Sequence, residues 1–207
     1  MRGQPQRGSR VGTGDRFLSE DEFRFLHDVL QHPEDGVNTR YKRLGFSGRR
    51  GYAVKEGLVD RGWLVDEIVG NAHTVHLRIP ENVLEILGTD VKDIPDTTVV
   101  HEYWKRHYGA LFIDRGYTVE LEAERQGGRV DILASRDGER IGIEIETGKS
   151  DVISNVRHGL QSKFTKIMVV ATDDAALRTV ERQLMEAGLL IAGRVDIVLR
   201  DGVDRER

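Results

Sequence analysis

Residues 128–149 read GRVDILASRDGERIGIEIETGK, two segments of alternating apolar and polar residues on either side of Asp137-Gly138. An Asp-Gly pair between alternating segments is a strong signal for a β-hairpin with a two-residue turn. If these two residues form the turn, Arg136 pairs with Glu139, and this pair fixes the register of the whole hairpin. The stretch therefore predicts two antiparallel strands, at 129–135 and 139–147, in a defined register.

The predicted register brings acidic side chains together. It places Asp131 directly opposite Glu144, with about 5 Å between their Cβ atoms. Because side chains alternate along a strand, Glu146 lies on the same face as Glu144. Four apolar residues are expected on the opposite face, in a core: Val130, Ile132, Ile143 and Ile145.

Three carboxylates on one patch of sheet need a compensating charge, because opposed like charges destabilise a sheet. Hard oxygen ligands favour Mg²⁺ or Mn²⁺. We therefore expect a divalent metal site at Asp131, Glu144 and Glu146. The alternative is an acidic strand face exposed to solvent, with Arg129 paired to Glu146 by the same register.

The hairpin lies inside a longer pattern of alternating helices and strands. The predicted elements around it are, in order, a helix at 99–115, a strand at 117–124, the hairpin, a helix at 151–163, a strand at 166–171, a helix at 175–187 and a strand at 195–199. This αβββαβ order, with a further helix and strand, predicts a domain at 99–207.

The N-terminal part predicts a second, smaller domain at 17–80. Ser19 and Glu22 match a capping box at the start of its first helix, and Gly70-Asn71 fits the turn of a hairpin. The predicted elements are helices at 19–31, 38–44 and 47–62 and strands at 63–69 and 74–79. We expect residues 1–16 to be a disordered basic tail and residues 81–98 to be a helix and a linker. The predicted fold class is therefore α+β with two domains.

Composition excludes several classes of protein. The 207 residues include no cysteine, which removes disulfides, thiol catalysis and cysteine-based zinc sites. No stretch approaches the roughly 20 apolar residues that span a bilayer, and no secretory signal precedes the first domain. We expect a cytoplasmic location without membrane association.

Charge is distributed unevenly along the chain. Residues 1–80 contain 13 Lys and Arg against 11 Asp and Glu, whereas the rest of the chain contains 18 against 24. Residues 37–55 contain basic residues and no acid, which favours contact with phosphates there. The basic residues predicted to contact DNA are Arg40, Lys42, Arg43, Arg49, Arg50 and Lys55.

Three helices followed by a hairpin at 17–80 resemble the winged helix-turn-helix family. In that family the third helix enters the major groove of DNA, so the resemblance implies DNA binding with Arg49, Arg50 and Lys55 on the recognition helix. A solvated basic helix face, or a winged helix that contacts only proteins, is the alternative.

The segments 128–131 and 143–149, together with the element order over 99–171, resemble the PD-(D/E)xK nuclease superfamily. This superfamily includes restriction endonucleases and archaeal Holliday-junction resolvases. The resemblance implies a restriction-endonuclease-like αβββαβ core with a mixed sheet and a site for Mg²⁺ or Mn²⁺. The metal ligands that it implies are Asp131, Glu144, the Ile145 carbonyl and, on the preceding helix, Glu102. For Glu102, a favourable charge at a helix N-terminus is the alternative.

The chain departs from the family motif at two positions. Val130 stands where the motif has proline, and Glu146 stands where it has lysine. By the resemblance, Glu146 would orient or deprotonate the attacking water. Lys149 precedes the helix at 151–163 and could bring a positive charge to a phosphate, or it could be an ordinary surface lysine.

These features predict a metal-dependent DNA endonuclease that is targeted by a winged-helix domain. The resemblance implies a homodimer, because cutting both strands requires two centres. One alternative is a nuclease-like subunit without activity that binds DNA or regulates, including one that works with a DNA-translocating ATPase. Another is a winged-helix transcription regulator.

Overall fold

The computed structural model describes residues 18–33, 35–68, 75–88, 91–95, 98–200 and 202. The chain forms two compact units, Met1–Asp96 and Thr97–Arg207. The predicted N-terminal tail and the predicted turn at Gly70-Asn71 lie outside the described residues. Within the described ranges, no helix is long and apolar enough to cross a membrane.

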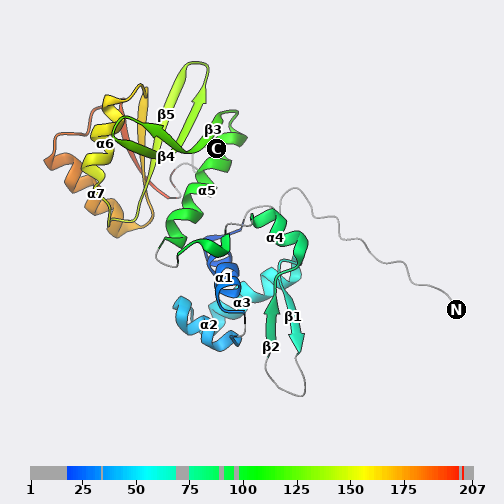
Figure 1. The fold of residues 1–207 in the computed structure, drawn as a ribbon. Coiled ribbons are helices and arrows are strands. Elements are labelled where there is room, and N and C mark those ends of the chain that lie inside the picture. Colours follow the sequence, from blue (N-terminus) through cyan, green and yellow to red (C-terminus); the bar gives the residue numbers. More distant parts are fainter. Residues whose placement is uncertain are drawn as a thin grey trace. The chain divides into compact units, whose positions relative to one another are not determined.

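Unit 1 consists of three helices, a two-stranded sheet and two short helical segments (Figure 1). Its elements are α1 (Glu20–Gln31), α2 (Val37–Leu44), α3 (Gly48–Asp60), β1 (Val65–Ile68), β2 (Val75–Arg78), α4 (Glu81–Leu87) and the 3-10 helix η1 (Val91–Asp93). The strands β1 and β2 are antiparallel. The predicted capping box is present, since Ser19 and Glu22 bond each other's backbone N–H groups. Phe25, Leu26 and Leu58 are fully buried and form the centre of the unit.

The predicted linker at 81–98 is in part a component of unit 1. Val91 and Ile94 are buried, and the Ile94 carbonyl lies 2.7 Å from Nε2 of the buried His27. The segment from 91 to 95 therefore packs against α1 as part of the folded unit. Sequence reasoning missed this because the segment is too short to have a helical or strand period.

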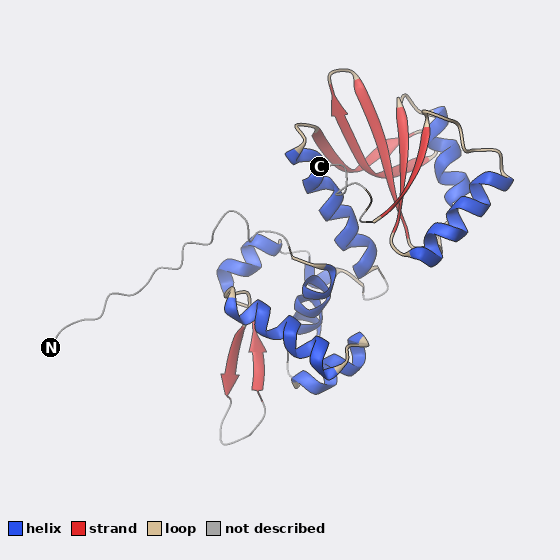
Figure 2. Cartoon of the chain, turned by 180° about the vertical axis from the view of Figure 1, so that it is seen from behind, coloured by secondary structure: helices blue, strands red, loops and turns tan. Residues whose placement is uncertain are grey.

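Unit 2 is an α+β fold around a five-stranded mixed sheet (Figure 2). Its elements are α5 (Val99–Asp114), β3 (Thr118–Arg125), β4 (Gly128–Arg136), β5 (Glu139–Glu146), α6 (Val152–Gln161), β6 (Lys166–Ala171), α7 (Asp174–Glu186) and β7 (Val195–Leu199). The strand order is β3-β4-β5-β6-β7. The first three strands are antiparallel, and β5, β6 and β7 are parallel. Each of these elements was predicted, with ends that differ by at most two residues.

The sheet separates two helical layers. Helix α5 packs on β3, β4 and β5, whereas α6 and α7 cover the opposite face (Figure 1 and Figure 2). A core between the sheet and α6 and α7 is built from aliphatic residues: Val152, Val156, Ile167, Val169, Val180, Leu184 and Val195. The strand β6 is apolar after its first residue, as expected for a strand that is covered on both faces.

The β4–β5 hairpin has the predicted register. Arg136 pairs with Glu139, and the pairing continues to Ile132 and Ile143. Asp137 has φ 50° and Gly138 has φ 85°, the left-handed conformations that this type of turn requires. The turn therefore fixes which residues of the two strands meet.

The two strands separate one step beyond the last pair, at Asp131. Glu122, which the β3–β4 register places beside Asp131, has φ 52°, and neither residue is paired in the ladder. Val130 packs in one cluster with Leu133, so the strict alternation that we expected from Val130 to Ile132 is broken at Asp131. The result is a fork between β4 and β5, with Asp131 at its opening.

Candidate functional site

At the fork, the Asp131 side chain bonds a backbone N–H of β5 that has no partner in the β4–β5 ladder. Its Oδ2 accepts a hydrogen bond from the backbone N–H of Ile145 at 2.8 Å and lies 3.1 Å from Nε2 of His101 on α5. The N–H and C=O of one strand residue point to the same side, so the Ile145 carbonyl also faces the fork. The Asp131 side chain is 17% exposed, so the carboxylate is reached from solvent.

Glu144 is buried on β5 and faces a buried arginine. Its Oε1 lies 2.6 Å from Nη2 of Arg125, but the pair does not form a well-aligned hydrogen bond. Burial, followed by the negative charge of Asp131, raises the pKa of Glu144 to about 8, and Arg125 offsets only part of this. An ionised Glu144 therefore requires more positive charge than Arg125 supplies.

Glu146 is the most deeply buried acid of the cluster, with 1% of its surface exposed. Its carboxylate accepts hydrogen bonds from Ser150 and, at 3.2 Å, from the side chain of Asn155 on α6. Burial raises the pKa of Glu146, although these two hydrogen bonds oppose the shift. Glu146 is therefore held by the start of α6 rather than presented to solvent.

Helix α5 contributes a further acid, Glu102, and two basic side chains, His101 and Lys105. Nζ of Lys105 lies 2.5 Å from Glu102 and 2.5 Å from Glu122 on β3. Contacts with Asp131 and then Glu102 raise the pKa of His101 to about 9. The neighbouring His101, followed by Lys105, lowers the pKa of Glu102 to about 2.

The cluster carries more negative than positive charge. Its five carboxylates are Glu102, Glu122, Asp131, Glu144 and Glu146, and its three basic side chains are His101, Lys105 and Arg125. Full ionisation leaves two negative charges, which one divalent cation would balance. The oxygen-rich donor set suits a hard cation.

The acids are not arranged as a ligand set in the described part of the chain. No three His, Asp or Glu side chains there are grouped so as to hold a metal ion directly. Three of the acids instead have internal basic partners: Asp131 lies beside His101, Glu102 bonds Lys105, and Glu144 forms an ion pair with Arg125. Metal binding would have to compete with these contacts or use the remaining carboxylate oxygens.

Lys149 lies outside the cluster. It is exposed in the loop between β5 and α6, and no ion pair is recorded for it among the described residues. The positive charges beside the acids come instead from His101, Lys105 and Arg125, none of which sequence analysis selected.

Glu122, which the sequence analysis also did not select, had a signal in the sequence that could have revealed it. The β3–β4 turn pairs Arg125 with Gly128, and the arithmetic used for Asp137-Gly138 would have placed Glu122 across from Asp131. His101, Glu102 and Lys105 share one side of a predicted helix, but helical spacing does not reveal which side faces the hairpin. Arg125 had no local signal, because its contact with Glu144 depends on how three strands and α6 come together.

The six basic residues predicted to contact DNA fall into two groups. Arg40 is fully buried and bonds Asp28 at 2.8 Å, and Lys55 is 8% exposed and bonds Asp66 at 3.0 Å. The prediction that Arg40 and Lys55 contact DNA is therefore corrected: Arg40 pairs with a buried acid, and the largely buried Lys55 pairs with Glu56 and Asp66. Sequence analysis failed here because it counted charges without knowing which helix faces pack.

The remaining basic residues reach solvent. Lys42 and Arg49 are exposed, and no ion pair is recorded for either within the described ranges. Arg43 pairs with Asp28 and Asp35, and Arg50 pairs with Asp21 at 2.7 Å while stacking over Phe46. On α3, Tyr52 is 60% exposed, one helical turn from Arg49.

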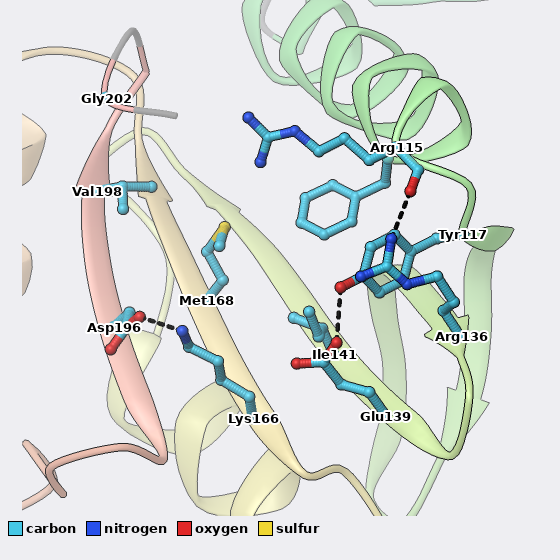
Figure 3. A pocket seen from close by; sticks show the side chains of 11 residues that line it. Arg115, Tyr117, Arg136, Glu139, Ile141, Lys166, Met168, Asp196, Val198 and Gly202 are labelled. Carbon is cyan, nitrogen blue, oxygen red and sulfur yellow. Dashed lines mark hydrogen bonds and ion pairs between the residues drawn. The ribbon is translucent and has the colours of Figure 1, made fainter. Parts of the chain in front are cut away.

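Unit 2 also has a pocket at the other end of the sheet (Figure 3). It lies over the first residues of β5 and β6, whereas Glu144 and Glu146 lie towards the end of β5. Tyr117 donates a hydrogen bond to Glu139 at 2.6 Å, and Lys166 pairs with Asp196. Because these polar groups bond one another, the pocket offers little chemistry.

Comparison with known proteins gives no family. No protein-family model matches the sequence, and no curated protein is significantly similar to it.

Proposed function

We propose that the chain is a metal-dependent DNA endonuclease, in which unit 2 hydrolyses phosphodiester bonds and unit 1 holds the DNA. The observation that carries the proposal is the acidic cluster at the fork between β4 and β5. Its carboxylates exceed its basic side chains by two charges, and Asp131 and Glu102 are accessible to solvent at its edge. Burying these acids together favours either protonation, as the raised pKa of Glu144 shows, or the binding of a cation.

The side chains would divide the work as follows. Asp131, Glu144 and the Ile145 carbonyl would hold the ion, with Glu102 as a further ligand from α5. A bound Mg²⁺ or Mn²⁺ would supply a nucleophile near neutral pH and stabilise charge on the phosphate. Arg125 would keep Glu144 in place. Glu146, bonded to Ser150 and Asn155, would lie on the buried side of the cluster and support it.

Unit 1 is proposed to bind DNA as a winged helix. The order of three helices and a hairpin favours this, and so do the exposed Lys42 and Arg49. The side chains best placed to contact DNA are these two with Tyr52, whereas Arg43 and Arg50 would first have to exchange an internal carboxylate for a phosphate. Homodimerisation would provide the two centres needed to cut both strands.

The burial of Glu146 favours a second candidate. The position that holds lysine in the motif of the nuclease superfamily carries here an acid that is 1% exposed and bonded internally. A group so placed does not reach an attacking water. A nuclease-like subunit that binds DNA without cutting it, such as a partner of a DNA-translocating ATPase, is consistent with this observation.

One assay separates the two candidates. The purified chain is incubated with linear and branched DNAs in Mg²⁺, Mn²⁺ or EDTA, and cleavage and binding are both measured. The endonuclease proposal expects metal-dependent cleavage that Asp131→Asn abolishes without loss of DNA binding. Binding without cleavage in either metal would reject it in favour of the second candidate.

A further inference from the structure

Asp131 receives both of its hydrogen bonds on a single oxygen. The Ile145 N–H and the His101 imidazole both approach Oδ2, at 2.8 and 3.1 Å. A carboxylate held by two donors on one oxygen has a fixed orientation. Its other oxygen, Oδ1, is then directed away from these donors and remains available as a ligand.

His101 is well suited to hold this orientation. It lies on α5, one turn before Lys105, which bonds Glu102 in a similar way. The imidazole is partly covered, with 26% of the side chain exposed, and its Nδ1 lies 3.8 Å from Glu102. At that distance Glu102 is a nearby charge rather than a hydrogen-bond partner, so the directional contact of His101 is the one with Asp131.

We infer that His101 is a positioning residue for the metal site, which orients Asp131 by an outer-sphere hydrogen bond and does not itself bind the metal. The inference rests on the proposed function. Partners of this kind commonly set metal affinity, because a ligand that must be reoriented binds more weakly. His101 would also reduce repulsion within the acidic cluster, which keeps the site compact before the ion arrives.

The experiment measures Mn²⁺ binding to the full chain by calorimetry and by electron paramagnetic resonance. His101→Leu removes the donor and is expected to weaken Mn²⁺ binding by about 10- to 100-fold. His101→Gln retains an N–H near the position of Nε2 and should restore most of the affinity. His101→Asn, whose amide is too short to reach Asp131, should behave like His101→Leu and serves in its place if that variant does not fold.

A matched control distinguishes positioning from general damage to α5. His107 lies on the same helix and stacks on aromatic rings. His107→Gln should therefore change the melting temperature more than the Mn²⁺ affinity. The variants of His101 should show the reverse.

Two outcomes would overturn the inference. One is unchanged Mn²⁺ affinity in a folded His101→Leu protein. The other is loss of affinity in His101→Gln together with a nitrogen coupling to Mn²⁺ in protein labelled with ¹⁵N-histidine, which would make His101 a direct ligand. If the folded wild-type chain binds no Mn²⁺ at all, the proposed function itself fails, and the wild-type measurement alone reveals this.

Discussion

The basic segment of unit 1 and the acidic cluster of unit 2 differ in how completely their charges are neutralised. In unit 1, Arg40 is buried against Asp28 and Lys55 pairs with Asp66, so much of the positive charge seen in the sequence is neutralised by acids of the same unit. In unit 2 the acids converge on a few basic residues and exceed them. A charged segment therefore indicates a binding surface only when its charges outnumber their internal partners.

The largest expected effect concerns the acidic cluster. If the proposed function holds, Asp131→Asn and Glu144→Gln should each reduce metal-dependent cleavage by about 100-fold or more, because each removes a proposed ligand of the ion that would activate water. Cleavage of plasmid DNA is the readout, and circular dichroism confirms folding. Wild-type rates in both variants would mean that the excess charge of unit 2 has no catalytic role.

The next effect tests whether Arg40 belongs to the interior. Arg40→Met leaves Asp28 buried with one of its two basic partners lost, and breaking a buried pair costs about 3–5 kcal/mol of unfolding free energy. Arg49→Met, on the exposed side of α3, should change stability by less than about 0.5 kcal/mol. Denaturant unfolding of both variants provides the comparison, and equal stabilities would contradict the division of basic residues made above.

A third effect is the pH dependence of the metal-free protein. The pKa of Glu144 is raised from 4.5 to about 8 and that of His101 from 6.5 to about 9. For each group, in the pH range between its unfolded and its folded pKa, the folded state binds more protons than the unfolded state. The free energy of unfolding therefore falls as pH rises. In EDTA the melting temperature should drop by several degrees between pH 6 and pH 9, since about 1 kcal/mol corresponds to roughly 4–8 °C in a small domain.

The variants identify the source of this loss. His101→Gln should flatten the part of the curve between pH 6.5 and 9, because glutamine does not titrate. A melting temperature that rises with pH in EDTA would show that neither group keeps its proton on folding.

The smallest expected effect concerns DNA binding by unit 1. Lys42→Ala and Arg49→Ala should each weaken binding severalfold and lower the slope of log affinity against log salt by about 0.9 per lost phosphate contact. Fluorescence anisotropy at several salt concentrations measures both quantities. A slope unchanged in the double variant would exclude this surface.

The sequence predicted the elements of unit 2 and the register of the hairpin as far as Ile132 and Ile143, because a two-residue turn and the period of a strand determine which side chains meet. It did not predict the fork at Asp131, since strict alternation assumes a regular strand and Glu122 adopts a left-handed conformation. It was harder to predict which face of a helix packs against the rest of the unit. Nothing in the spacing of Arg40 or His101 indicates whether the residue turns towards a buried acid or towards solvent, because that depends on tertiary packing.

The bond between the Ile145 peptide and Asp131 makes one backbone proton a reporter of the fork. In a regular hairpin that proton would point at a neighbouring carbonyl, but here it points at an ionisable oxygen. In a nuclear magnetic resonance spectrum, its chemical shift and its exchange with solvent should follow the state of that single carboxylate. An occupant of the cluster could then be detected without any substrate, by observing one amide signal.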